Sequence, residues 1–436
     1  MSLNITLLLL AGILVVLMQA GFALVVTGLC RAKNAVQVIS TNLAVFAFSA
    51  LGFWVCGFAL MSVIWQGVPA APGLTAQHWF FLHGTGSESS VLARFFFQAA
   101  LIAVAAVIPV GAMAERWKFS TVIPYGFFVS AVPLPIFGNW VWGGGWLSRL
   151  GSSLKLGQGF VDFAGASVIH MAGGVIGLVG AMMLGPRIGK YARDGRPRPM
   201  PGHNLVYVTV GTVILAVGWF GFNLGPAVFT GGQGAPLIAV NTLLASAAGA
   251  ASAYAVVTMK FHKPDPSMVC NGLLAGLVAI SASCAFVNPA GAVITGAVAG
   301  LLVVYAVLFF EGTMKVDDPA GAVSIHGVGG AWGVVSLGLM ADGRSDGQGK
   351  VVTGAFATLF GGPNNDWSQL GAQLIGAAAC LVFLGLTSWA WFKICGLVSP
   401  IRSRHEDELA GLDLPEMGSE CYPDFHLTDK GSTRAD

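Results

Sequence analysis

Eleven long apolar runs dominate this sequence, and each is close to the roughly 20 residues that a helix needs to cross a hydrocarbon core of about 30 Å. They predict an all-α polytopic membrane protein. A transmembrane barrel is a poor alternative, because its strands alternate apolar and polar residues over about ten positions, whereas these runs are long and continuous. The shorter apolar runs at 79–82 and 351–360 are expected in outer loops. The predicted spans cover residues 5–29, 40–64, 95–114, 120–141, 162–185, 204–226, 234–259, 269–287, 290–311, 320–341 and 370–397.

Charged residues are few and unevenly placed. They make up 10% of the 436 positions, whereas an average soluble domain has about 25%. Thirteen of the 42 lie after position 400. This distribution excludes a soluble enzyme, a disordered chain and a nucleic-acid binder. It predicts a membrane domain over residues 1–398, held in a lipid bilayer, and a short polar tail over residues 399–436.

Basic residues fall mostly on alternate loops between the predicted spans. If the N-terminus is outside, 17 of the 22 lysines and arginines face the cytoplasm and five face out. Cytoplasmic loops of membrane proteins carry such an excess. We therefore expect a multi-pass protein of the cell (inner) membrane, with the N-terminus outside and the C-terminus in the cytoplasm. The loop at 186–203, with five basic residues and four prolines, divides the chain after the fifth span.

A segment of the fifth predicted span recurs in the tenth. DFAGASVIHMAGGVIG at 162–177 and DPAGAVSIHGVGGAWG at 318–333 match at nine of 16 positions. The two spans run in opposite directions, which indicates a five-span unit repeated in inverted orientation, followed by a long eleventh helix. A weaker echo links Gly21-Phe22 on the first span with Gly221-Phe222 on the sixth. Such repeats place their working site near the midplane, where the two halves meet.

The repeat contains the two histidines that lie inside predicted spans, His170 and His326. One buried histidine more often serves packing alone, but two ionisable residues at equivalent intramembrane positions favour a function. Each follows an aspartate by eight residues, about 12 Å along a helix. We expect Asp162 and Asp318 to be helix caps at span mouths, with an added effect of Asp162 on an arriving cation. Two histidines are half of a four-ligand shell, so we expect neither a metal nor another cofactor.

Aromatic residues gather before and after the histidines. Trp140 and Trp146 are typical of the aromatic belt at a membrane interface. Trp142 begins a Trp-Gly-Gly-Gly run, whose flexible backbone would let the indole face a vestibule and attract a small cation by about 0.5–2 kcal/mol. Phe222 is expected at the outer end of the sixth span, where a packing role and a plug are equally compatible with the pattern.

Taken together, several segments resemble the Amt branch of the ammonium transporter (Amt/Mep/Rh) family. The resemblance implies an eleven-helix fold, a homotrimer with one pore per subunit, and ammonium uptake regulated by a cytoplasmic PII-type signal protein. The match in the tail favours a docked regulatory segment over a solvated disordered one. The matching segments are MQAGFAL and GLCRAKN within 18–34, FFQ and GAMAER within 96–116, WVWGGGWL at 140–147, DFAGASVIH at 162–170, GWFGFNLG at 218–225, NGLLAGLVAIS at 271–281, VDDPAGAVSIHG at 316–327, and GLDLPEMG with a following Tyr within 411–422.

The resemblance also suggests roles for single residues. It implies that His170 and His326 are the twin pore histidines. It places Trp142 and Asp162 at the outer ammonium-recruiting site and Phe222 in the gate below that site. Beside the pore we expect Trp219 and Ser281.

The sequence departs from the family pattern at the entrance. Leu101 stands four residues after Phe97, where the family has its second gate phenylalanine, and Pro226 stands where a serine often completes the recruitment site. Phe97, Leu101 and Pro226 are therefore candidate recruitment residues, and Leu101 is also a candidate gate residue. Val26 replaces a usual glutamate of the first span, and Met417 replaces a usual histidine of the tail.

An apolar lumen would let such a pore distinguish ammonium from potassium, which has a similar size and charge. Dehydrating a cation there is too costly, so an ionisable species neutralises instead. We expect ammonium, or its analogue methylammonium, to lose its proton at the aromatic mouth and cross as the neutral amine past the histidines, with net charge movement. The alternatives are an ammonium sensor that acts through a cytoplasmic partner and a neutral-gas channel as in the Rh branch. No nucleophile–base set suggests an enzyme.

Overall fold

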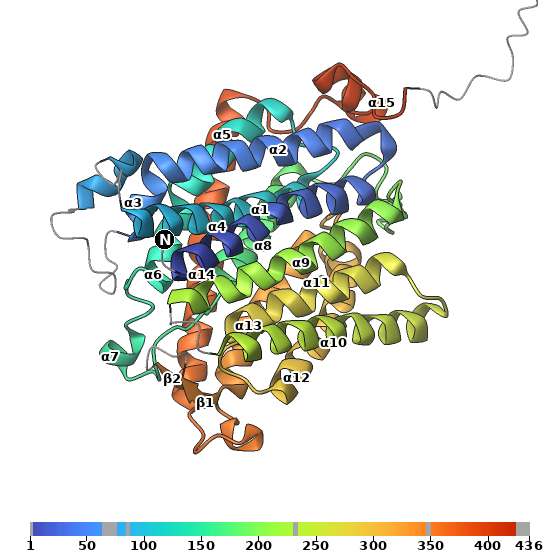
Figure 1. Ribbon diagram of the computed structural model, residues 1–436. Coiled ribbons are helices and arrows are strands. Elements are labelled where there is room, and N and C mark those ends of the chain that lie inside the picture. The colour runs from blue at the N-terminus through green and yellow to red at the C-terminus, as the bar shows by residue number, and fades with distance from the viewer. Residues whose placement is uncertain (1–2, 63–75, 84–87, 230–233, 346–349, 424–436) are drawn as a thin grey trace, which may run out of the picture.

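Among the residues that the computed structural model describes, eleven helices are long and apolar enough to cross a membrane, which confirms the predicted number of spans. The structure describes residues 3–62, 76–83, 88–229, 234–345 and 350–423. Its α-helices form one bundle, in which the long α14 crosses beside the others (Figure 1). The α-helices are α1 Leu3–Leu29, α2 Ala35–Gly52, α3 Phe58–Ser62, α4 Ser89–Met113, α5 Phe119–Ala131, α6 Pro133–Val141, α7 Leu150–Leu154, α8 Ala172–Leu184, α9 Leu205–Phe229, α10 Ala235–Phe261, α11 Pro266–Ser283, α12 Pro289–Phe309, α13 Gly329–Met340, α14 Trp367–Val398 and α15 His405–Ala410.

Several spans are less regular than the sequence predicts. The fourth span breaks into α5 and α6 at Val132, because Pro133 has no N–H to continue the helix. The run at 351–360 contains strand β2 (Val351–Thr353), which pairs antiparallel with β1 (Asp342–Ser345). The remaining short helices are the π-helices η2 Phe53–Gly57, η4 Ala166–Met171, η5 Phe310–Met314, η6 Val323–Val328 and η8 Asp413–Met417, and the 3₁₀-helices η1 Ala32–Asn34, η3 Ala76–Leu82 and η7 Ala357–Phe360.

The first helices of the two halves, α1 and α9, pack directly against each other. A Cβ added to Gly21 would lie 2.9 Å from the carbonyl oxygen of Gly211, and a Cβ added to Gly211 would lie 2.8 Å from that of Gly21. Glycine at both positions therefore allows the backbones to approach closely, as in other membrane helix pairs. The reciprocal contact agrees with an inverted repeat.

The two histidine-bearing spans meet in the same reciprocal way. A side chain on Gly174 would overlap the backbone of Gly327, and one on Gly330 would overlap that of Ala166 and Met171. Gly174 and Gly330 are equivalent in the repeat, as are Met171 and Gly327. Each of these spans also begins with a π-helical turn, η4 or η6, that contains the histidine. This symmetric crossing brings the two histidines together.

Replacing Gly174 with alanine is expected to push the two histidine-bearing spans apart, because the new methyl group has only backbone atoms to displace. Overpacking of this kind costs about 1–3 kcal/mol. Thermal unfolding of the detergent-solubilised protein would show the loss. Gly385→Ala is the matched control, since its nearest contact would be an ordinary 3.9 Å. Equal unfolding temperatures for the two variants would contradict the close crossing.

The two ends of the bundle differ. The end that carries α15, called the tail end below, also contains the turn between α1 and α2 (Figure 1). The short helix α7 and the β1–β2 hairpin lie at the opposite end. The candidate site lies between these ends, where α1, α4, α9 and the two π-helical turns converge.

Candidate pore site

Two imidazole rings touch in the interior of the bundle. The Nδ1 atoms of His170 and His326 are 3.3 Å apart, and the ring centroids are 5.2 Å apart with nearly parallel planes. Both side chains are buried. One Nδ1 must donate and the other accept, so this hydrogen bond requires at least one neutral ring. The Nε2 atom of His170 is buried without a partner, which leaves one polar edge free for a small solute.

Aromatic rings cover both histidines. Trp219 and Phe222 stack on His170 at 4.8 and 5.0 Å between centroids, and Phe22 lies 5.7 Å from His326. Phe222 therefore contacts His170, deeper than the outer end of the sixth span where the sequence placed it. Phe22 was not singled out as a site residue. The weak echo between Gly21-Phe22 and Gly221-Phe222 was the signal for it, since each phenylalanine contacts one histidine.

The side chain of Ser281 holds the Trp219 ring in place. Its Nε1–H donates to the Ser281 hydroxyl at 3.0 Å, and that hydroxyl donates to the Leu277 carbonyl oxygen at 2.9 Å. The Ser281 carbonyl oxygen accepts from the N–H of Ala164. One serine thus connects the aromatic cover of His170 to the segment that leads into the His170 helix.

Trp142 lies over the start of the same helix. Its Nε1–H donates to the Asp162 carbonyl oxygen at 2.7 Å, and its six-membered ring would lie 3.2 Å from a Cβ on Gly165. Gly165 has a φ of 119°, which favours glycine, so the indole covers a turn that other residues rarely adopt. The indole is half-buried and leaves part of its surface accessible.

Asp162 and Asp318 cap the two π-helical turns, and the helices begin four or five residues after them. Asp162 is buried and accepts five hydrogen bonds, four from main-chain N–H groups and one from the Ser167 hydroxyl. Asp318 accepts from the N–H groups of Ala322 and Val323 only. The prediction that each aspartate lies about 12 Å from its histidine along a continuous helix is therefore wrong, because the first half of the eight-residue interval is a turn.

The candidate recruitment residues Phe97, Leu101 and Pro226 lie on α4 and α9. Phe97 is buried with its ring against Gly225, the residue before Pro226, so these two helices touch at this level. Leu101, one turn further along α4, is buried as well. Pro226 lies inside α9 and has no N–H for the carbonyl oxygen of Phe222, four residues earlier. The carbonyl oxygen of Phe222 therefore lacks its usual helical donor.

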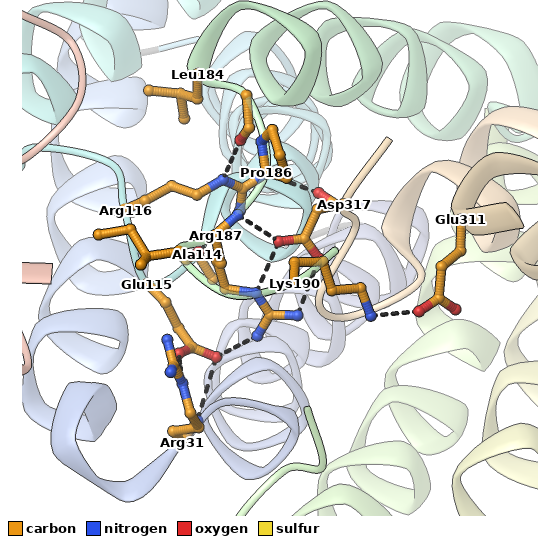
Figure 2. A network of polar contacts seen from close by, with 12 residues as sticks. Arg31, Ala114, Glu115, Arg116, Leu184, Pro186, Arg187, Lys190, Glu311 and Asp317 are labelled. Carbon is orange, nitrogen blue, oxygen red and sulfur yellow. Dashed lines mark hydrogen bonds and ion pairs between the residues drawn. The ribbon is translucent and has the colours of Figure 1, made fainter. Parts of the chain in front are cut away.

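A buried charge network joins four chain segments at the tail end (Figure 2). Arg187 donates to both carboxylate oxygens of Asp317, at 2.9 and 3.0 Å, and also pairs with Glu115. Glu115 pairs with Arg31 as well. Arg116 donates to main-chain oxygens of Ala114, Gly185 and Asp317. The network connects the ends of α1, α4 and α8 to the residue before Asp318.

The charges of this network depend on one another. Burial would raise the pKa of the Asp317 carboxyl, but the hydrogen bonds and charge of Arg187 outweigh it and hold this pKa at about 2. Burial would lower the pKa of Arg187, yet Glu115 and Asp317 raise it above its ordinary value. Asp317 and Arg187 are therefore ionised at neutral pH, and removing Arg187 would leave the Asp317 carboxylate buried without this partner.

The tail packs against the bundle through three acidic residues. Glu408 accepts from the N–H of Ile188 at 2.7 Å and pairs with Arg402. Asp413 accepts from the N–H of Gln37 in the first turn of α2, and Glu416 accepts from that of Phe119 at the start of α5. These contacts agree with the expected docked segment over residues 399–423; residues 424–436 lie outside the described part.

An inverted repeat with a hydrogen-bonded imidazole pair at the interface of its halves defines this chain as a multi-pass membrane transport protein. Comparison with known proteins gives the particular family: residues 6–422 match the model of the Ammonium Transporter Family, and the chain belongs to it. The chain is 43% identical to ammonium transporter Amt2 of Archaeoglobus fulgidus over 427 residues, which cover 97% of this chain and 88% of that protein. It is 35% identical to ammonium transporter Amt1 of Haloferax mediterranei, covering 97% and 80%.

Solved structures agree with this assignment. A protein described as "Sensor Amt Protein" superposes with a TM-score of 0.82 at 32% identity, covering 95% of this chain and 98% of the other. Mep2 of Candida albicans gives a TM-score of 0.75 at 25% identity, covering 96% and 90%. The fold is therefore that of the Amt/Mep proteins over nearly the whole described chain.

Proposed function

We propose that this protein takes up ammonium by holding the cation at an outer aromatic site, removing its proton and conducting ammonia past His170 and His326, with net movement of charge. The observation that carries the proposal is the buried imidazole pair, 3.3 Å between Nδ1 atoms, with aromatic rings on both sides. A bare cation in such surroundings loses its hydration without equivalent ligands. Ammonium escapes this cost by releasing a proton, whereas potassium cannot.

The aromatic cover and the free Nε2 edge of His170 support a neutral solute. Ammonia can donate to Nε2 or accept from it, depending on the tautomer of the ring. The Phe22 and Phe222 rings keep the remaining walls apolar. His170 and His326 would guide the solute, and they are also placed to pass on the released proton.

Electrical recording on proteoliposomes tests the proposal directly. Pulses of ammonium and methylammonium are expected to give saturable currents, and potassium pulses of equal concentration are expected to give none. Growth of an ammonium-uptake-deficient cell at low ammonium would separate transport from sensing. Failure of both assays would favour the sensor alternative. Two observations support that alternative: Leu101 and Pro226 depart from the family pattern, and a solved structure described as "Sensor Amt Protein" is similar to this chain.

Trp142 is proposed to hold the arriving cation, with Asp162 positioning the indole through its carbonyl oxygen. Trp142→Leu is expected to raise the half-saturating ammonium concentration by about 2- to 30-fold, the equivalent of 0.5–2 kcal/mol of cation–π attraction. The maximal current should change little, because the imidazole pair is intact. Trp146→Leu, at an exposed neighbouring indole, is the control. An unchanged half-saturating concentration would place recruitment elsewhere.

The assembly and orientation remain proposals that rest on the family. We propose a homotrimer in the cell membrane with the N-terminus outside, so that the tail end faces the cytoplasm. The docked tail, residues 399–423, would then be available to a PII-type signal protein. Cross-linking in native membranes and cysteine labelling from each side would test assembly and orientation.

A further inference from the structure

A cavity of about 250 Å³ lies at the tail end, between the turn that joins α1 to α2 and the docked tail. None of the steps proposed above uses it. Gly411 allows the tail to pass close to this turn, because its φ of 112° favours glycine and a Cβ there would lie 2.5 Å from the carbonyl oxygen of Lys33. The lining residues that matter for its chemistry are Lys33, Asp413, Leu414, Glu420, Cys421 and Tyr422.

Asp413 is the first sign of a missing partner. Its side chain lines the cavity and is 3% exposed. Oδ1 accepts from the N–H of Gln37 at 2.9 Å, whereas Oδ2 has no hydrogen-bond partner. A buried acceptor without a donor is unfavourable, and more so when the acceptor is charged. A group that brings N–H donors into the cavity would remove this cost.

A second carboxylate of the lining, that of Glu420, acts on the first. Burial raises the pKa of the Asp413 carboxyl, N–H groups at the start of α2 lower it, and the negative charge of Glu420 raises it further. Two like charges at short range disfavour each other's ionised form, and a cation between them would remove this repulsion. The acidic pair therefore favours a positively charged occupant.

Lys33 is the basic side chain of the lining, and its ammonium group is used elsewhere. Nζ donates to the carbonyl oxygens of Glu408 and Leu409 near the end of α15, where carbonyl groups lack helical donors. Lys33 therefore caps α15. Among the lining residues the two carboxylates outnumber this ammonium by one, so the cavity keeps a negative balance.

Exposed leucines beside the cavity indicate that the occupant belongs to a protein. Leu409 is 53% exposed and Leu414 is 57% exposed, although the tail lies outside the predicted spans. Adjoining apolar side chains with a polar rim, on a surface that no membrane covers, are typical of protein interfaces. Leu414 lines the cavity, and Leu409 precedes the lining residue Ala410. A protein segment with apolar residues beside a cationic one would cover these groups together.

We propose that this cavity receives an arginine side chain of a cytoplasmic partner protein, with the guanidinium group between Asp413 and Glu420. Apolar residues of the partner would then cover Leu409 and Leu414. Arginine suits the cavity better than lysine, because its planar guanidinium offers five donors and can bridge two carboxylates. The placement of the tail end in the cytoplasm rests on the proposed function. Occupancy would hold the tail segment 411–422 against the turn between α1 and α2.

Cys421 reports whether the cavity is occupied, because its thiol is exposed and lines it. The full-length protein in lipid nanodiscs is treated with iodoacetamide, and the modification of each cysteine is followed by mass spectrometry. A short peptide with arginine between two leucines is expected to slow modification of Cys421 in a saturable way. The same peptide with citrulline, which has a similar shape and no charge, should need about tenfold higher concentrations, equal to 1.4 kcal/mol. Cys395 on α14 is the internal control and should react at an unchanged rate.

Agmatine, a small guanidinium compound without leucines, separates a protein segment from a free cation. It should protect Cys421 at least tenfold more weakly than the arginine peptide. Equal protection by agmatine, equal protection by the citrulline peptide, or no protection by any of the three would overturn the proposal. The measurement requires no transport, so a protein without an ammonium current would still give a result for this cavity.

Variants decide which carboxylates bind. Asp413→Asn and Glu420→Gln are each expected to weaken protection by the arginine peptide about tenfold, equal to 1.4 kcal/mol. Asp413→Asn keeps an oxygen acceptor for the N–H of Gln37, so the tail should stay docked. Faster modification of Cys421 without peptide would show that the tail has been released, and Glu420→Gln then decides.

Asp407→Asn is the matched control for the two variants. Its carboxylate is on the same tail but pairs with the exposed Arg404 and does not line the cavity. Protection in this variant should equal that of the unchanged protein. Undiminished protection in Glu420→Gln and in a docked Asp413→Asn protein would refute the assignment.

Discussion

Replacing His170 with leucine is expected to reduce the ammonium current by about tenfold or more. The substitution removes the free Nε2 edge and leaves Nδ1 of His326 without its partner. A solute that loses one hydrogen bond in an apolar path pays about 1–3 kcal/mol, and 1.4 kcal/mol is a factor of ten in rate. The current is measured on proteoliposomes at saturating ammonium, so that recruitment at the entrance does not limit it.

The control for this prediction is a histidine of a different kind. His262 is exposed at the end of α10 with a left-handed backbone, which asparagine also tolerates. His262→Asn should leave the current unchanged. A His170→Leu protein that folds normally and still carries a saturable, potassium-excluding current would show that the imidazole pair is not the conduction site.

The central site was predictable because its signal is a repeat. His170 and His326 lie 156 positions apart, but the surrounding matches in sequence, together with opposite span directions, already place them at one interface. Symmetric packing of Gly174 and Gly330 then supplies the contact. Span number was predictable for a similar reason, since apolar length depends only on local composition.

The depth of Phe222 in its span and the π-helical turns at the histidines were not predictable from the sequence. Phe222 was placed at the outer end of its span, although it stacks on His170, because span boundaries read from a sequence are uncertain by about two to four residues and α9 continues to Phe229. The π-helical turns depend on aspartate caps that accept several N–H groups at once. Spacing on an ideal helix cannot reveal such a turn.

The charge network was missed because its members are far apart in sequence and look like ordinary loop residues. Arg187 counted as one basic residue of a cytoplasmic loop, and Asp317 lay within a segment, 316–327, that was used only for the family resemblance. Their pairing depends on how the ends of α4 and α8 meet the start of η6. The hydrogen bonds of the tail were missed for the same reason. Asp413 and Glu416 accept from N–H groups at the starts of α2 and α5, which lie almost 300 residues or more away in sequence.

This network gives the second large prediction. Arg187→Leu is expected to make the protein about 3–5 kcal/mol less stable, because it leaves Glu115 and Asp317 buried without their common partner. The change would appear in equilibrium unfolding in mixed micelles at neutral pH. Arg196→Leu removes an arginine from the same loop, but its pair with Asp194 is exposed, so no measurable change is expected.

The difference in stability between the Arg187→Leu variant and the unchanged protein is expected to become smaller in acid. The pKa of Asp317 is held at about 2 by Arg187, below the ordinary value of 3.8. A carboxyl with a depressed pKa stabilises the folded state above its unfolded pKa, and this contribution is lost as the pH falls from about 4 to about 2. In the variant the carboxyl loses that partner, so its pKa rises and protonation relieves the unpaired charge. A stability gap that stayed constant over this pH range would show that Arg187 acts through packing alone.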